Sequence, residues 1–458
     1  MKNFDIVILG GGPGGMMAGM ILAQAGKSVA IVQDETDSIG GVCLNRGCMP
    51  TKSMLKAAKV YRDAKNGERY GLDVSVGPVD LHRIGTVTEG DLNKLRAMTQ
   101  MSMDKSQITV FRGLGSFVSD HEIRISKNDS TREQVRGEQI IIATGSTPFE
   151  LPFAPFDGQH ILSSDHILKN TELPKRLLIV GGGALGCEFA TLYNSFGSSV
   201  TMVEGLATLM PREDREAGTR LQAAFEEQGI TVKVGTSIEH MAVENGTVQV
   251  RYQGIDTNEE FDKVLVGVGR RPNTSGLNLE AAGVKTERGA VAVNDFMQTS
   301  VPHIYALGDV IGGIMLAHVA EKEGYLLAHN LLKGTRNPLD LRVVPRVGYC
   351  HPEVAALGVS ESAPGIKGCT LAQAPNGRSV VDKVNPAFVK LFIEETTNQI
   401  AGAIIIGEGA SEMIHEVAVA MENRLTLEQV NKTVHAHPTH SKNVLLAVQN
   451  AYSKADRH

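Results

Sequence analysis

The chain has 458 residues, of which 42% are hydrophobic and 21% are charged. This composition excludes a disordered, collagenous or coiled-coil chain, and the length suggests about three domains. The formal net charge of −6 offers no broad basic surface for nucleic acid, and five cysteines are too few for a disulfide-stapled secreted scaffold.

The first long uncharged run, residues 6–26, resembles a membrane span or a secretory signal only at first sight. A row of glycines with Pro13 interrupts its centre, and Asp5 precedes it where a secretory signal carries positive charge. We therefore expect no targeting segment and no membrane association. The low cysteine content favours the reducing cytoplasm.

The same run fits a strand, a glycine-rich loop and a helix. Residues 4–9 are apolar and short enough for a strand, and residues 16–25 have the composition of a buried helix. Between them lies a G-x-G-x-x-G motif, whose glycines are Gly10, Gly12 and Gly15. Such a loop lets the backbone approach a pyrophosphate, and the N-terminus of the helix offers free N–H groups to the phosphates.

A second strand over residues 28–32 ends where the motif usually carries an acid that bonds a ribose. Here that position is Gln33, and Asp34 follows it. A carboxamide can also form a hydrogen bond with a ribose hydroxyl, so the ribose contact stays open between Gln33 and Asp34.

The pattern recurs later in the chain. A strand over residues 176–180 precedes a second motif, and a strand over residues 199–203 ends at Glu204, equally far after its loop. The glycines of the second motif are Gly181, Gly183 and Gly186. One motif is weak support for a nucleotide site, but two copies with the same flanking strands are strong support. Glu204 can bond both hydroxyls of an unmodified ribose but repels a 2′-phosphate, which favours NAD over NADP.

Two cysteines, Cys43 and Cys48, lie just beyond the first ribose strand. No second Cys or His pair with zinc spacing follows them. If the segment opens a helix, the two sulfurs lie on neighbouring turns, where a disulfide is plausible and the helix start would stabilise a thiolate. Their place beside a dinucleotide loop favours a redox-active pair over two inert thiols. We expect Cys187, Cys350 and Cys369 to be packing residues.

Several motifs together resemble the pyridine nucleotide–disulfide oxidoreductase family from end to end of the chain. Besides the two glycine loops, they are GGVCLNRGCMPTK at residues 40–52, Ala143-Thr144-Gly145, the GRRPN turn with Gly269 and Arg270, YALGDV with Gly308 and Asp309, and MLAHVAEKEG with Ala317. The resemblance implies an α/β fold with two Rossmann-like dinucleotide-binding domains, a central segment and a C-terminal α+β interface domain. It implies an FAD-binding domain at 1–146, an NAD-binding domain at 147–270, a central domain completing the FAD site at 271–344, and an interface or dimerisation domain at 345–458.

The resemblance also implies the cofactors and their contacts. It assigns FAD to the first glycine loop and NAD to the second, with no metal. Asp309 would bond the ribitol–phosphate region of the flavin, and Ala317 would run beside the flavin pyrimidine. Lys52 would lie beside the flavin, with Glu188 as its carboxylate partner.

The C-terminal part resembles the interface domain of dihydrolipoyl dehydrogenases. Strands are expected at 388–393 and 400–406, with a helix at 412–423. A histidine-rich run, HAHPT, would then supply the catalytic base, His437, to the disulfide of the other subunit, which implies a homodimer. Without the resemblance, a metal site would be an alternative, but no third ligand lies near the histidines in sequence.

The resemblance therefore implies an FAD-dependent dithiol–disulfide oxidoreductase. His437 would deprotonate a dihydrolipoamide-like dithiol, the thiolate would attack Cys43, and Cys48 would remain as a thiolate at the flavin, from which electrons reach NAD. The dithiol is a small molecule or a lipoyl domain, and a 2-oxoacid dehydrogenase complex is one candidate partner. The alternatives are an NADH-driven reductase of another disulfide or a quinone, and a flavoprotein subunit of a larger complex.

One residue departs from the family pattern. Lys442 stands where a glutamate usually pairs with the catalytic histidine. A cation disfavours the imidazolium that the base must form, so catalysis should weaken. Three explanations stay open: a slower dihydrolipoyl dehydrogenase, a relative with another disulfide or quinone substrate, or replacement of the role by His440 or an acid such as Glu416.

Overall fold

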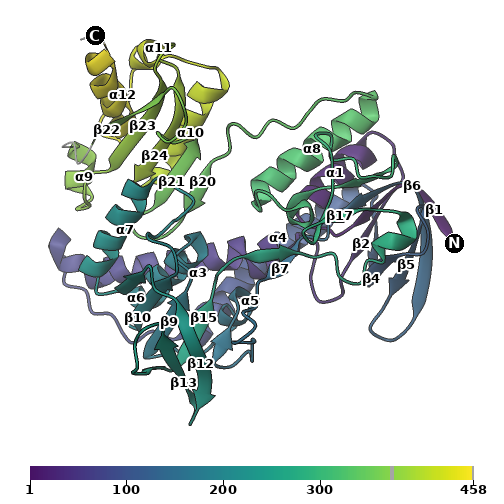
Figure 1. The fold of residues 1–458 in the computed structure, drawn as a ribbon, viewed down its shortest axis with the longest axis horizontal. Helices are drawn as coiled ribbons and strands as arrows, with labels where there is room; N and C mark the ends of the chain where they lie inside the picture. Colours follow the sequence, from purple (N-terminus) through teal and green to yellow (C-terminus); the bar gives the residue numbers. More distant parts are fainter. Residues whose placement is uncertain (372–375, 456–458) are drawn as a thin grey trace. The chain divides into compact units, whose positions relative to one another are not determined.

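The computed structural model describes residues 1–371 and 376–455 (Figure 1). The chain forms two compact units that alternate along the sequence. The first unit comprises Met1–Ser53, His82–Phe149 and Gly269–Asp340, and the second comprises Met54–Leu81, Glu150–Val268 and Leu341–His458. No helix in the described part of the chain is both long enough and apolar enough to cross a bilayer.

A seven-stranded sheet forms the basis of the first unit. Its strands are β1 (Lys2–Leu9), β2 (Val29–Gln33), β3 (Thr109–Arg112), β4 (Leu114–Phe117), β5 (Glu122–Ser126), β6 (Arg132–Ile142) and β19 (Ile304–Ala306). β1, β2, β3, β6 and β19 pair in parallel, whereas β4 and β5 form an antiparallel edge. All five residues of β2 are buried, as expected for a parallel strand covered on both faces.

Two helices lie side by side against this sheet (Figure 1). They are α1 (Pro13–Gln24) and α8 (Ala317–Lys333). A Cβ atom on Gly324 would collide with the carbonyl oxygen of Gly14, so glycine is required where the two helices cross. The other elements that begin or lie in this unit are α2 (Gly41–Arg46), α3 (Cys48–Lys65), β7 (Ser146–Pro148), β16 (Arg270–Pro272), β17 (Thr286–Glu287), β18 (Ala290–Val291) and most of α4 (Leu81–Lys105).

The second unit contains a five-stranded parallel sheet that repeats the strand–loop–helix plan. Its strands, in spatial order, are β11 (Thr231–Val234), β10 (Ser199–Glu204), β9 (Arg176–Val180), β15 (Lys263–Val266) and β8 (Ile161–Leu162). An antiparallel sheet of β12 (Ile238–Glu244), β13 (Thr247–Tyr252) and β14 (Glu259–Phe261) accompanies it. The helices are α5 (Ser164–Ile167), α6 (Ala184–Phe196) and α7 (Arg215–Glu227).

The C-terminal part of this unit is an antiparallel sheet covered by helices (Figure 1). Its strands, in spatial order, are β20 (Arg346–Gly348), β21 (Val354–Gly358), β24 (Ile400–Ile406), β23 (Phe388–Glu394) and β22 (Ile366–Leu371). The helices are α9 (Gly377–Val381), α10 (Ala410–Glu422), α11 (Leu427–Asn431) and α12 (Lys442–Ala455). Met413, Val417 and Met421 of α10 are buried in the shared core, which confirms the helical spacing expected from the sequence.

The expected fold class is confirmed, because both glycine motifs lie between a parallel strand and a helix. The sequence predicts four domains that follow one another along the chain, whereas each of the two compact units is built from three separate segments of it. Their boundaries stay a prediction.

Acid should destabilise the second unit through His351. Burial lowers the pKa of this histidine from 6.5 to about 4, and the charge of Arg62 acts in the same direction. The unfolded chain binds the His351 proton more tightly than the folded chain does. The free energy of unfolding therefore has its full value above pH 6.5, the ordinary pKa of histidine, and falls as the pH drops toward 4. The loss approaches about 3 kcal/mol.

The His351→Gln variant should therefore lose less Tm than the wild-type protein between about pH 7 and pH 4. Thermal unfolding followed by circular dichroism at several pH values measures this difference. If the Tm values of the two proteins fell in parallel as the pH is lowered, protonation of His351 would not contribute to the acid destabilisation, and the prediction would be wrong.

Candidate active site

The first glycine loop joins β1 to α1 with the backbone geometry that a close phosphate requires. Gly10 has a φ of +104°, and a Cβ on Gly15 would collide with the carbonyl oxygen of Gly10. A Cβ on Gly12, by contrast, would meet no atom within 4 Å. Gly12 therefore leaves space open before the N-terminus of α1, where a pyrophosphate fits.

The second loop, between β9 and α6, has the same geometry. Gly181 has a φ of +112°, and a Cβ on Gly186 would collide with the carbonyl oxygen of Gly181. A Cβ on Gly183 would again meet nothing within 4 Å. Both loops thus use two glycines for tight packing and one to leave room for a ligand.

Each glycine loop donates a backbone hydrogen bond to a side chain at the end of the strand that follows its helix, β2 for the first loop and β10 for the second. The Gln33 carboxamide oxygen accepts the N–H of Gly11 at 2.8 Å, and the Glu204 carboxylate accepts the N–H of Gly182 at 2.6 Å. Asp34 instead accepts two hydrogen bonds from Thr36 in its own turn. Gln33, not Asp34, therefore lies at the position that matches Glu204.

The two cysteines lie on either side of a helix break. Cys43 is in α2, and Cys48 is the first residue of α3, so the single helix considered from the sequence is wrong. Gly47 separates them, and a Cβ there would lie 2.9 Å from the carbonyl oxygen of Val42. The two cysteines are not joined by a disulfide; Cys43 is half-buried and Cys48 is exposed.

The electrostatic surroundings give the two sulfurs different roles. A hydrogen bond to Cys48 raises the pKa of the Cys43 thiol well above its usual range, and burial adds to the rise. The charge of Glu321 raises the same pKa, whereas that of Lys52 lowers it. The hydrogen bond and the burial thus favour the protonated form of the Cys43 thiol, while Cys48 is the first residue of α3.

Glu321 is a charged neighbour of the cysteines that the sequence analysis missed. It lies in α8, in the same MLAHVAEKEG segment as Ala317. Only the fold reveals its position, because helical spacing in α8 does not show which residue faces the cysteine pair.

The remaining motifs that the sequence predicts to bind the flavin also lie in the first unit. Ala143, Thr144 and Gly145 follow β6, and the hydroxyl of Thr144 donates to the carbonyl oxygen of Asn273 at 2.8 Å. Ala317 begins α8. Gly269 begins the last segment of this unit, Arg270 opens β16 directly after it, and the side chain of Arg270 donates a hydrogen bond to Ser146.

Gly308 and Asp309 form a short 3-10 helix with Val310 and Ile311. The Gly308 N–H donates to the carboxylate of Glu323 at 2.6 Å. Burial raises the pKa of the Glu323 carboxyl to about 7, and the charge of Asp309 contributes to the rise.

Lys52 and Glu188 belong to different units, so their expected pairing stays a prediction. Glu188 is buried in α6, where its carboxylate accepts the N–H of Tyr349 at 3.0 Å.

The histidine-rich loop before α12 has two histidine–carboxylate pairs. Nε2 of His435 lies 2.6 Å from Oε1 of Glu416, and Nε2 of His440 lies 2.9 Å from Oδ2 of Asp382. His437 is exposed and has no hydrogen bond or ion pair within residues 1–371 and 376–455. Glu416 is thus bound to a different histidine, and Lys442 opens α12.

A further group of possible metal ligands, Asp120, His121 and His303, lies in the first unit. The two imidazole rings are stacked, parallel within 3° and with centroids 3.9 Å apart. Because a bound ion lies in the plane of each imidazole, two parallel rings cannot share one without rotating. Hydrogen bonds explain the pair instead: His121 bonds the carbonyl oxygen of Gly137, and His303 bonds that of Asp120.

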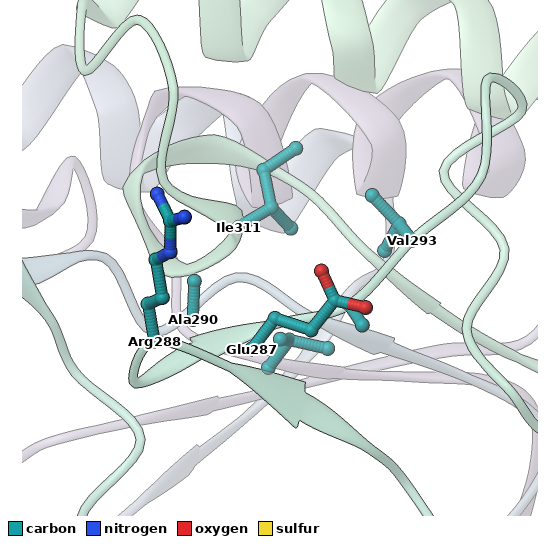
Figure 2. A pocket seen from close by; sticks show the side chains of 7 residues that line it. Glu287, Arg288, Ala290, Val293 and Ile311 are labelled. Carbon is teal, nitrogen blue, oxygen red and sulfur yellow. The ribbon is translucent and has the colours of Figure 1, made fainter.

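A hollow of about 330 Å³ lies next to the short helix that carries Asp309 (Figure 2). Its lining residues are Glu287, Arg288, Ala290, Val291, Ala292, Val293 and Ile311. Figure 2 shows the charged side chains of Glu287 and Arg288 near the apolar side chains of Val293 and Ile311. None of the site residues expected from the sequence lines this hollow.

Comparison with known proteins identifies the family. Residues 4–324 match the model of the pyridine nucleotide-disulphide oxidoreductases, and residues 344–448 match the dimerisation domain of the same family. The dihydrolipoyl dehydrogenase of Chlamydia pneumoniae is 38% identical over 451 residues, which cover 96% of this chain and 95% of that protein. A dihydrolipoyl dehydrogenase of Bacillus subtilis is 36% identical over 444 residues, which cover 95% and 96%.

Two solved structures have the same fold. LpdA from Mycobacterium tuberculosis superposes with a TM-score of 0.90 at 27% identity and covers 98% of this chain and 100% of its own. The HOCl-induced flavoprotein disulfide reductase RclA from Escherichia coli superposes with a TM-score of 0.87 at 27% identity, covering 97% and 99%. With its two nucleotide loops and its cysteine pair, the chain belongs to the pyridine nucleotide–disulphide oxidoreductase family and is a flavoprotein oxidoreductase that uses FAD and NAD.

Proposed function

We propose that the chain oxidises a dithiol of the dihydrolipoamide type with NAD, through FAD and the Cys43–Cys48 pair. The observation that carries the proposal is the pair itself, with Cys43 in α2 and Cys48 at the start of α3, close enough for a hydrogen bond between their sulfurs. The similarity to dihydrolipoyl dehydrogenases over almost the whole chain supports the substrate class.

The two cysteines account for the exchange steps. A substrate thiolate attacks the sulfur of Cys43 in the oxidised pair, the Cys43–Cys48 bond breaks, and Cys48 leaves as a thiolate. The second substrate thiolate then attacks the mixed disulfide and releases Cys43, so that the substrate leaves as a disulfide and the protein pair is reduced by two electrons. Bound FAD would supply the two-electron carrier between this dithiol and NAD.

The residues around the nucleotide loops fit these cofactors. The open space at Gly12 and Gly183 supports a pyrophosphate at each loop, and we assign Gln33 and Glu204, which accept hydrogen bonds from the loop backbones, to the two riboses. We assign the flavin surroundings to Lys52, with Glu188 as its carboxylate partner, by similarity to the family. Asp309 would bond the ribitol–phosphate region.

We assign the base to His437 of a second subunit. The match to a dimerisation domain supports a homodimer. Exposed apolar side chains in the same part of the chain also support it, because Val380, Val381 and Val434 are 70%, 65% and 94% exposed. A second copy covering these residues would remove them from water.

A lipoyl domain of a 2-oxoacid dehydrogenase complex, in the cytoplasm, is the partner and location that best suit such a substrate.

One observation favours the second candidate, an NADH-driven reductase of another disulfide or of a quinone. Lys442 replaces the usual carboxylate, and His437 has no acidic partner among the described residues. Reduction of an acceptor does not require the deprotonation of a dithiol.

Matched alanine substitutions should separate the two nucleotide sites. Since a Cβ at Gly12 or Gly183 meets no protein atom, both Gly12→Ala and Gly183→Ala should fold with the wild-type Tm. Gly12→Ala should be purified with little FAD. Gly183→Ala should keep its FAD and raise the KM for NAD by about tenfold, which corresponds to one unfavourable contact of ~1.4 kcal/mol. The same cofactor defect in both variants would contradict the assignment.

Replacement of the exchange sulfur should abolish dithiol turnover. Cys43→Ser should lower kcat with dihydrolipoamide and NAD by about a thousandfold or more, because the oxygen cannot form the mixed disulfide. NADH oxidation by an artificial one-electron acceptor should survive, since it needs no disulfide. Cys369→Ser, at a buried thiol in β22, is the control and should keep both activities. Full dihydrolipoamide turnover in Cys43→Ser would overturn the proposed function.

Restoring the family carboxylate should improve the base. Lys442→Glu should raise kcat for dihydrolipoamide oxidation by about three- to tenfold, because one pKa unit of imidazolium stabilisation corresponds to ~1.4 kcal/mol. Lys442→Gln, which removes only the cation, should give a smaller gain. Equal kcat in all three proteins would mean that position 442 does not act on His437.

A further inference from the structure

A buried hydroxyl connects three segments around the second FAD motif. The Oγ of Ser146 donates to Oδ2 of Asp309 at 2.5 Å and accepts a hydrogen bond from Nε of Arg270 at 2.7 Å. Nη2 of Arg270 also donates to the carbonyl oxygen of Ser146 at 2.8 Å. Ser146 is only 3% exposed, so water does not replace these bonds.

The direction of every bond in this group is fixed by chemistry. A guanidinium can only donate and an ionised carboxylate can only accept. The hydroxyl proton of Ser146 must therefore point at Asp309, while a lone pair of its oxygen receives Arg270. A serine hydroxyl normally rotates, but here it has a single allowed orientation.

The backbone explains why these residues meet. Ser146 lies in β7 and Arg270 in β16, and these two short strands pair antiparallel. A second carboxylate fixes the other side of the motif, because Glu323 in α8, 4% exposed, accepts the N–H of Gly308. The segment Gly308-Asp309 is thus held by its backbone and by its side chain.

The two oxygens of Asp309 differ in consequence. Oδ2 is bonded to Ser146, whereas no residue in the described ranges bonds Oδ1. A carboxylate with one oxygen anchored presents the other in a fixed direction. An unanchored carboxylate would rotate, and Arg270 could then pair with it directly.

We propose that Ser146 is a positioning residue for FAD, which orients the Asp309 carboxylate so that Oδ1 faces the cofactor, with Arg270 fixing the hydroxyl. The proposal rests on the proposed role of Asp309 at the ribitol–phosphate region. In this proposal Arg270 acts on FAD binding through Ser146, and not on the binding of the nicotinamide nucleotide.

The test compares two equally buried serines in the full-length protein. Ser198 is 4% exposed and its hydroxyl donates to the carbonyl oxygen of Pro174 at 2.6 Å, so Ser198→Ala removes a similar bond far from Asp309 in sequence. The FAD affinity of the apoprotein is measured by the change in flavin fluorescence on binding, beside the Tm of each apoprotein. Ser146→Thr keeps the hydroxyl and serves as the conservative variant.

Ser146→Ala should weaken FAD binding by about tenfold, since it leaves a half-buried carboxylate and a half-buried guanidinium without their shared partner. Ser198→Ala should change FAD affinity by less than about twofold even where its Tm falls equally, and Ser146→Thr should recover most of the affinity. Unchanged FAD affinity in Ser146→Ala, with or without a lower Tm, would overturn the proposal. If Asp309→Ala also bound FAD normally, the proposed role of Asp309 would fail first, which separates the two claims.

Discussion

The close approach of the Cys43 and Cys48 side chains is the constraint on which the rest of the site depends. The helical chain breaks between the two cysteines at Gly47, where a Cβ would lie 2.9 Å from the carbonyl oxygen of Val42. The break places Cys48 at the N-terminus of α3, whose free N–H groups favour a thiolate. Two neighbouring sulfurs, one half-buried and one exposed, are the structural basis of a thiol–disulfide exchange reaction.

The two nucleotide loops show how one backbone plan accepts different side chains. Both loops have three glycines at the same spacing. In both, a backbone N–H of the loop donates to the side chain at the end of the following strand. The acceptor is neutral in Gln33 and charged in Glu204. The bond to the loop needs only an oxygen acceptor, so either residue satisfies it, and the difference in charge remains available for selecting the ribose.

Much of this architecture could be predicted because it depends on local patterns. The glycine spacing, the apolar strands β1 and β9 and the helical spacing of α10 are sequence-local, and each is found where expected. Contacts between distant segments could not be predicted in this way. The influence of the Glu321 charge on Cys43 and the hydrogen bonds of Asp382 with His440 and of Ser146 with Asp309 depend on how helices and short strands pack. No periodicity in the chain reveals that packing. The helix break at Gly47 was also missed, since glycine inside a helical pattern is often tolerated.

The central claim is that the Cys43–Cys48 pair exchanges electrons with bound FAD. Anaerobic titration of the purified flavoprotein with dithionite, followed by flavin absorbance, tests it most directly. A disulfide and a flavin in one circuit take up four electrons per FAD, two for each centre, and the account predicts this stoichiometry. Complete reduction by two electrons per FAD would mean that the cysteines are not connected to the flavin and would contradict the account.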